Sequence, residues 1–154
     1  MYQIRRTDYG LYLTLSGHIQ TEEMRQWLED LTAHLSKMSG KFGVFVDMRH
    51  MILLPPDSQP AMRLGQDLAR KAGMIRSVII LADEVIALQF RRIAKQSGIF
   101  SGERYIDALS VPNWEQVGLD WLIRGIEPYK EDDPSLSDSV RLVLPDPSKH
   151  EPLA

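Results

Sequence analysis

Two uninterrupted apolar runs constrain the fold of this chain more than any other feature. They are Phe-Gly-Val-Phe-Val-Asp at 42–47 and Ser-Val-Ile-Ile-Leu-Ala at 77–82. Runs without polar alternation are typical of central parallel strands that are covered on both faces. Between them, residues 59–72 show helical spacing, with Pro60 tolerated in the first turn and Gly73 as the stop. This order predicts a right-handed parallel crossover.

The flanking segments extend this pattern to a complete α/β domain. Residues 2–7 and 11–15 read as an antiparallel hairpin around the turn at 8–10. Helices are predicted over about 21–38, 83–96 and 112–123, with Thr21 and Asp83 as N-caps, and a short strand over 104–106. We therefore expect a mixed, mainly parallel five-stranded sheet with an N-terminal antiparallel hairpin, in the order β-β-α-β-α-β-α-β-α.

Charge and proline divide the 154 residues into two parts. The segment 127–154 holds seven acidic residues against three basic ones, and five of the nine prolines. Such a composition disfavours regular structure. We predict a domain at 1–126 and an acidic, proline-rich arm at 127–154. Within the arm, Ser-Val-Arg-Leu-Val-Leu at 139–144 is strand-like, and we hypothesise that it adds to a sheet edge of its own subunit or of a second one, giving a homodimer.

Several kinds of chemistry are disfavoured by what the sequence lacks. There is no Cys, and the four histidines have no ligand-type partner at helical spacing, so we predict no metal site. Neither Gly-x-Gly-x-x-Gly nor a P-loop occurs, so no cofactor is expected. The net charge of −3 argues against a nucleic-acid binder. Met1 leads into Tyr-Gln-Ile-Arg-Arg and no apolar run is long enough for a membrane span, which predicts a cytoplasmic protein.

The segment that leaves the strand at 42–47 contains the candidate site. Its polar residues are Asp47, Arg49, His50, Asp57 and Ser58. Ligands of open α/β sheets bind at the carboxyl ends of the strands, so these residues are predicted to contact a ligand or a partner. A Ser-His-Asp hydrolase is the enzymatic alternative, but Ser58 lies in Asp-Ser-Gln-Pro and not in a nucleophile elbow. We therefore predict no catalytic residue and no enzyme.

Two further features of the sequence leave alternatives open. The loop Met-Ile-Leu-Leu-Pro-Pro at 51–56 either tucks under the domain or forms an exposed binding lip. Six bases on or near two predicted helices form either a solvated face or a weak anion-binding surface; they are Arg70, Lys71, Arg76, Arg91, Arg92 and Lys95.

The chain also resembles a bacterial, largely uncharacterised group, the SpoIIAA-like domains, which are related to the STAS domains of anti-sigma factor antagonists. The resemblance rests on Val-Phe-Val-Asp at 44–47, Ile-Arg-Ser-Val-Ile-Ile-Leu-Ala-Asp at 75–83, and the segment from Tyr105 to Leu122. In the antagonists a phosphorylatable serine follows the equivalent strand, which makes Ser58 a candidate phosphosite; the Asp-Ser-Ser-Gly type sequence is absent, and N-capping is the structural alternative for Ser58.

The resemblance and the candidate site together predict a function. We expect a non-catalytic binding or regulatory module that recognises a partner protein or a small apolar or anionic ligand through 47–58. The alternative is a Sec14-like carrier of a lipid or another hydrophobic ligand, because Sec14-type carriers are sometimes grouped with these domains.

Overall fold

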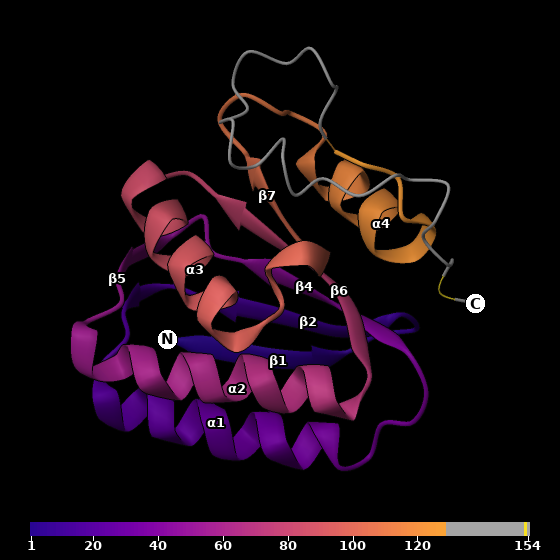
Figure 1. Ribbon diagram of the computed structural model, residues 1–154. Helices are drawn as coiled ribbons and strands as arrows, with labels where there is room; N and C mark the ends of the chain where they lie inside the picture. The colour runs from indigo at the N-terminus through magenta and orange to yellow at the C-terminus, as the bar shows by residue number, and fades with distance from the viewer. Residues whose placement is uncertain (129–152, 154) are drawn as a thin grey trace.

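A computed structural model of the chain describes residues 1–128 and 153, and its core is one mixed sheet (Figure 1). The strand order is β1-β2-β4-β6-β7, in which β1 and β2 pair antiparallel and the other pairs are parallel. The strands are β1 (Tyr2–Arg6), β2 (Gly10–Leu15), β4 (Phe42–Asp47), β6 (Met74–Leu81) and β7 (Glu103–Asp107). The predicted α/β class and its mainly parallel five-stranded sheet are confirmed.

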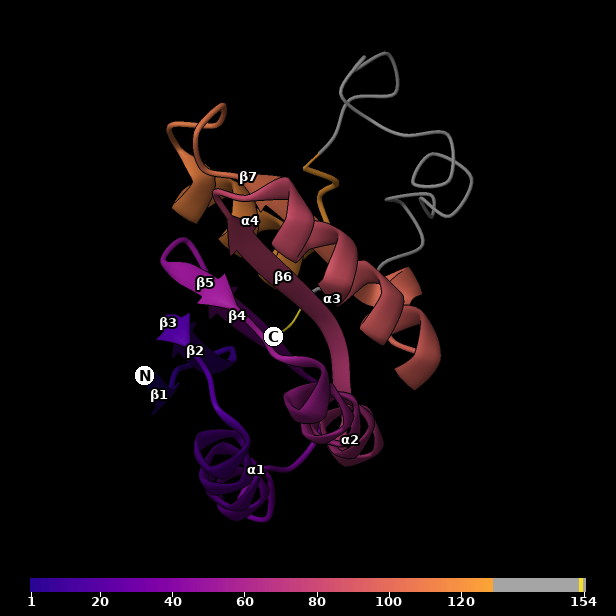
Figure 2. The ribbon, with the colours of Figure 1, turned by 90° about the vertical axis from the view of Figure 1, so that its left-hand side faces the viewer.

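Within residues 1–128, four helices cover the sheet in two unequal layers. They are α1 (Thr21–Leu35), α2 (Gln59–Ala72), α3 (Glu84–Ser97) and α4 (Trp114–Arg124). The first three pack on one face over the larger hydrophobic core, and α4 covers the other face over a smaller core around Phe45 and Trp121 (Figure 2). Because β4 and β6 are covered on both faces, their continuous apolar runs are explained.

Most predicted helix boundaries lie close to the observed ones, and of the N-caps Asp83 agrees with the prediction and Thr21 does not. Asp83 caps α3 as predicted, because its carboxylate accepts from the backbone N–H groups of Val85 and Ile86. Thr21 is instead the first residue of α1, and the cap position belongs to Gln20. The first helix also ends at Leu35, three residues before the predicted end.

The sequence pattern did not predict a second, two-stranded sheet. It joins β3 (Gly17–His18) to β5 (Met51–Leu53) in parallel, and the Gly17 N–H donates to the carbonyl of His50 at 2.8 Å. Two or three residues are too few to show a period, so the sequence carries no strand signal here. Short 3₁₀ turns precede α2 at Pro56–Ser58 and β7 at Phe100–Gly102.

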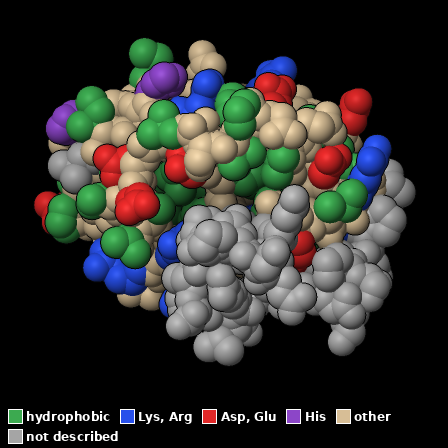
Figure 3. Space-filling model, turned by 90° about the horizontal axis from the view of Figure 1, so that it is seen from above, with side chains coloured by type: hydrophobic (Ala, Val, Ile, Leu, Met, Phe, Trp, Pro, Cys, Tyr) green, Lys and Arg blue, Asp and Glu red, His purple; other side chains and the backbone are tan. Residues whose placement is uncertain are grey.

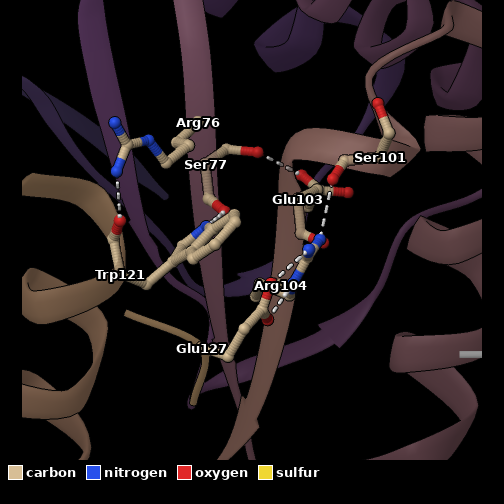
Figure 4. Close-up of polar contacts among 7 residues, drawn as sticks. All are labelled: Arg76, Ser77, Ser101, Glu103, Arg104, Trp121 and Glu127. Carbon is tan, nitrogen blue, oxygen red and sulfur yellow. Dashed lines mark hydrogen bonds and ion pairs between the residues drawn. The ribbon is translucent and has the colours of Figure 1, made fainter. Parts of the chain in front are cut away.

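A buried polar network ties α4 to the sheet (Figure 4). The Arg104 guanidinium donates to both carboxylate oxygens of Glu127, at 2.8 and 2.9 Å, and lies 4.2 Å from the centre of the Trp121 ring. Arg76 is buried and donates to the Trp121 carbonyl at 3.1 Å. Arg76 therefore belongs to the interior, so both alternatives considered for it, a solvated face and an anion-binding surface, are wrong at this residue.

Most of the arm predicted at 127–154, including its strand-like segment at 139–144, lies outside the described residues. Glu127 is bound to Arg104, and the Leu153 N–H donates to the Ile123 carbonyl at 2.7 Å. The described ends of this segment therefore contact the domain.

Gly10, at the start of β2, pairs with Gly43 of β4 and leaves no room for a side chain between them. Its φ is +149°, and a Cβ added there would lie 2.0 Å from the carbonyl oxygen of Gly43 in β4. We expect Gly10→Ala to lower the free energy of unfolding by about 2 kcal/mol, through steric overlap and backbone strain. Gly17→Ala is the matched control, because Gly17 also has a positive φ but has open space around its Cβ position. Urea unfolding followed by tryptophan fluorescence measures both, and an equal cost for the two variants would contradict the steric argument.

Candidate functional site

The carboxyl ends of β4, β6 and β7 lie at one edge of the sheet, which faces the viewer in Figure 2. We call this the carboxyl edge and define it by residues 47–58, 82–88 and 107–110. Every residue of the predicted site falls in the segment 47–58, although Ser58 is buried beneath the surface. The three segments meet because adjacent parallel strands end together: the Met48 N–H donates to the Ile80 carbonyl, and the Ala108 N–H to the Leu81 carbonyl.

Asp47 and Arg49 form a fixed pair at the end of β4. Asp47 is buried and accepts from the Arg49 backbone N–H at 3.1 Å, from Nε at 3.0 Å and from Nη2 at 2.9 Å. The same guanidinium lies 4.3 Å from the centre of the Trp114 ring. Burial by itself would raise the pKa of Asp47, but the hydrogen bonds and charge of Arg49 outweigh it and hold that pKa below its ordinary value. Asp47 is therefore an ionised carboxylate that positions Arg49 against Trp114.

Ser58 occupies a different environment from the one that the sequence suggests. It is fully buried, and its hydroxyl donates to the Ile19 carbonyl at 3.1 Å. The predicted capping bond to α2 is absent, because the Ser58 backbone is itself in the helical region and its hydroxyl turns to Ile19 instead. Phosphorylation of Ser58 stays a prediction, and burial of the hydroxyl is an obstacle to it. The hydroxyl proton is also engaged at Ile19, so this geometry lacks the Ser-His bond that a hydrolase needs.

The apolar loop at 51–56 is partly tucked under the domain and partly exposed, so each of the two alternatives left open by the sequence describes part of it. Met51 and Leu54 are buried in the core, whereas Ile52 is 61% exposed. Residues of β5 and α3 are neighbours, and α3 begins with two more exposed aliphatic side chains, Val85 at 65% and Leu88 at 64%. They are three residues apart and so lie on the same face of α3. After β7, Leu109 is 78% exposed.

Exposed acidic side chains lie in the same three segments as these aliphatic residues. Asp57, Asp83, Glu84 and Asp107 are all exposed. Figure 3 shows acidic side chains lying among hydrophobic ones on the left of the view, the side on which the strands end. Within the described parts of 47–58, 82–88 and 107–110, the basic residues are Arg49, which is paired with Asp47, and His50, which is exposed. The carboxyl edge is therefore an apolar surface with an acidic rim.

The prediction located the edge but missed part of its surface. Asp47, Arg49, His50 and Asp57 lie there, with His50 and Asp57 exposed, whereas Ser58 lies beneath it. Val85, Leu88 and Leu109 were missed, because one exposed aliphatic residue in a helix or loop has no significance until the fold places several together. Trp114 was missed because it lies 65 residues from its partner, Arg49.

Two observations bear on metals and membranes. Among residues 1–128 and 153 no three His, Asp or Glu side chains lie close enough to hold a metal ion. No helix in the same residues is long and apolar enough to span a bilayer.

Comparison with known proteins found no relative of this chain. No protein-family model matches the chain, and no curated protein matches it either. The resemblance to SpoIIAA-like domains therefore stays a prediction, and the carboxyl edge has to be interpreted from its own geometry.

Proposed function

We propose that this chain is a non-catalytic binding module that recognises a protein partner at the carboxyl edge, through a partner segment with an apolar face and basic flanks. One observation carries the proposal. Four large aliphatic side chains of the carboxyl edge, in β5, at the start of α3 and after β7, are 61–78% exposed; they are Ile52, Val85, Leu88 and Leu109. Exposed apolar side chains that gather with a polar rim are typical of protein interaction sites.

The acidic rim of the carboxyl edge indicates that the partner is basic. Asp57, Asp83, Glu84 and Asp107 are exposed carboxylates of the carboxyl edge, and the one Arg within residues 47–58, 82–88 and 107–110, Arg49, is bound to Asp47. A basic partner would gain from these charges, whereas an anionic membrane surface or a second acidic edge would be repelled. An amphipathic helix with lysine or arginine flanks combines both requirements. This proposal extends the expected regulatory role of a SpoIIAA-like domain and requires no reaction.

A pair of synthetic peptides tests the proposal on the native chain. One is a fluorescein-labelled 15-residue helix with leucines at i, i+3, i+4 and i+7 and lysines elsewhere; the other has glutamates in place of the lysines. We expect saturable binding of the lysine peptide by fluorescence anisotropy, at least about fivefold weaker at 0.5 M than at 0.05 M salt, and no binding of the glutamate peptide. Equal binding of both peptides, or binding of neither, would contradict the proposal.

A further inference from the structure

Strand β1 ends the sheet and has an open hydrogen-bonding edge. Among residues 1–128 and 153 it pairs only with β2, and Figure 2 shows it as the end strand of the row. Met1 and Ser16 exchange two backbone hydrogen bonds at one end of this pair, and Thr7 and Gly10 exchange two at the other. Bonded and non-bonded residue pairs alternate along an antiparallel ladder. The backbone groups of the even-numbered residues of β1 therefore point away from β2.

These even-numbered residues are Tyr2, Ile4 and Arg6. Within residues 1–128 and 153 their backbone N–H and C=O groups form no hydrogen bond. Proteins commonly block such an edge with a proline, with a β-bulge or with a covering segment. Strand β1 contains no proline, and its register with β2 is regular over its whole length. The edge can therefore accept the backbone of another extended segment.

The two ends of this edge differ in charge. At one end the Tyr2 hydroxyl donates to Asp30 of α1. Burial, this hydrogen bond and the charges of Asp30, Glu23 and Glu29 raise the pKa of Tyr2 to about 12. At the other end Arg6 is exposed. The edge is therefore acidic around Tyr2 and basic at Arg6.

The centre of the edge is apolar. Ile4 lies between Tyr2 and Arg6 on the same face of β1, because side chains alternate along a strand. It packs against the larger core and is half-buried. Residues directly opposite each other in antiparallel strands interact. A complementary strand thus has an acidic residue opposite Arg6, an apolar one opposite Ile4 and a basic one opposite Tyr2.

We propose that the outer edge of β1 binds an extended segment of a protein partner, which runs antiparallel to β1 and has the sequence pattern acidic-x-apolar-x-basic. Backbone hydrogen bonds to the three outward-facing residues hold the segment, and the charges at the two ends set its direction. This surface is separate from the carboxyl edge, because no residue of β1 belongs to 47–58, 82–88 or 107–110.

A synthetic peptide with this pattern, Ser-Glu-Thr-Val-Thr-Lys-Ser, tests the proposal on the native chain. We expect a saturable titration in ¹H–¹⁵N NMR spectra, with slower hydrogen exchange at the amides of Ile4 and Arg6. The same peptide with an N-methyl group on its valine should not bind, because the methyl group removes the central donor and blocks the approach of the two strands. No saturation by about 5 mM peptide, or equal binding of the methylated peptide, would overturn the proposal.

The chain without peptide shows whether the edge is already occupied. We expect fast exchange at the amides of Ile4 and Arg6, since both point away from β2. Protection of these amides in a monomer would mean that another part of the same chain covers the edge. Protection that rises with protein concentration would mean that a second copy does. Either result would overturn the proposal.

A charge reversal tests the direction of the segment. Arg6→Glu places a like charge opposite the glutamate of the peptide and should weaken binding at least about threefold, and a peptide with lysine in place of that glutamate should recover it. Arg5→Glu is the matched control, because it changes the net charge equally but lies on the other face of β1, 4.9 Å from the centre of the Tyr12 ring. An equal effect of the two variants would contradict the proposed pairing.

Discussion

Glu127→Ala is expected to lower the free energy of unfolding by about 3–5 kcal/mol, the cost of leaving a buried charge without its partner. Arg104 is 2% exposed, and Glu127 meets it with both carboxylate oxygens. Without Glu127 the guanidinium retains two backbone carbonyls and the face of Trp121, none of which carries a neutralising charge. Urea unfolding followed by tryptophan fluorescence measures the loss.

Two further variants separate the charge from the packing. Arg124→Ala removes the exposed base of an ion pair on α4, with Asp120 at 3.9 Å, and should cost no more than about 1 kcal/mol. The double variant Arg104→Met with Glu127→Leu removes both buried charges and should recover much of the stability that Glu127→Ala loses. A cost below about 1 kcal/mol for Glu127→Ala would show that the pair contributes little.

Glu103 is expected to make the stability of the domain fall as the pH rises. Burial raises its pKa from 4.5 to about 7, against the smaller opposing effects of the Tyr105 and Ser77 hydrogen bonds. Between these two pH values the folded chain holds a proton that the unfolded chain has released. The contribution is thus fully present below pH 4.5 and is lost by about pH 7, at about 1.4 kcal/mol per pH unit, or about 3 kcal/mol in all.

Comparison with Glu103→Gln isolates this effect from other titrating groups. The difference in free energy of unfolding, native minus variant, should fall by about 3 kcal/mol from pH 4.5 to 8. Any constant cost of the amide shifts the whole curve and leaves its slope unchanged. Glu115→Gln is the control for replacing an exposed carboxylate by an amide. A flat difference for Glu103→Gln would mean that its pKa is ordinary in the folded state.

The parts of the fold that could be predicted from the sequence are those determined by residues close together along the chain. The range Phe42–Asp47 is recovered to the residue because a β-branched and aromatic run has few alternatives, and Gln59–Ala72 because Pro60 and Gly73 mark its ends. Asp83 could be predicted as a cap because its partners are two and three residues away. In each case the residues that decide the local structure lie within a few positions of one another in the sequence.

The rest depends on partners that are distant in sequence. Ser58 bonds Ile19, which is 39 positions away, and nothing near Ser58 indicates that this carbonyl will lie beside it. Arg76 was missed for the same reason. In the sequence it follows Arg70 and Lys71 and suggests a surface base, but α4 covers it in the fold. A polar residue at the start of a strand suggests exposure, so Glu103 gave no sign that it would be buried.

The exposed aliphatic residues of the carboxyl edge make the central claim directly measurable. Binding of the lysine peptide should be compared between the native chain, the double variant Val85→Ser with Leu88→Ser, and Leu64→Ser, which removes a 47% exposed leucine from α2. Loss of two aliphatic contacts worth about 1.5 kcal/mol or more each predicts a fall in affinity of at least about a hundredfold for the double variant. Leu64→Ser should bind as the native chain does. Equal affinity in all three proteins would contradict the assignment of the carboxyl edge as the binding surface.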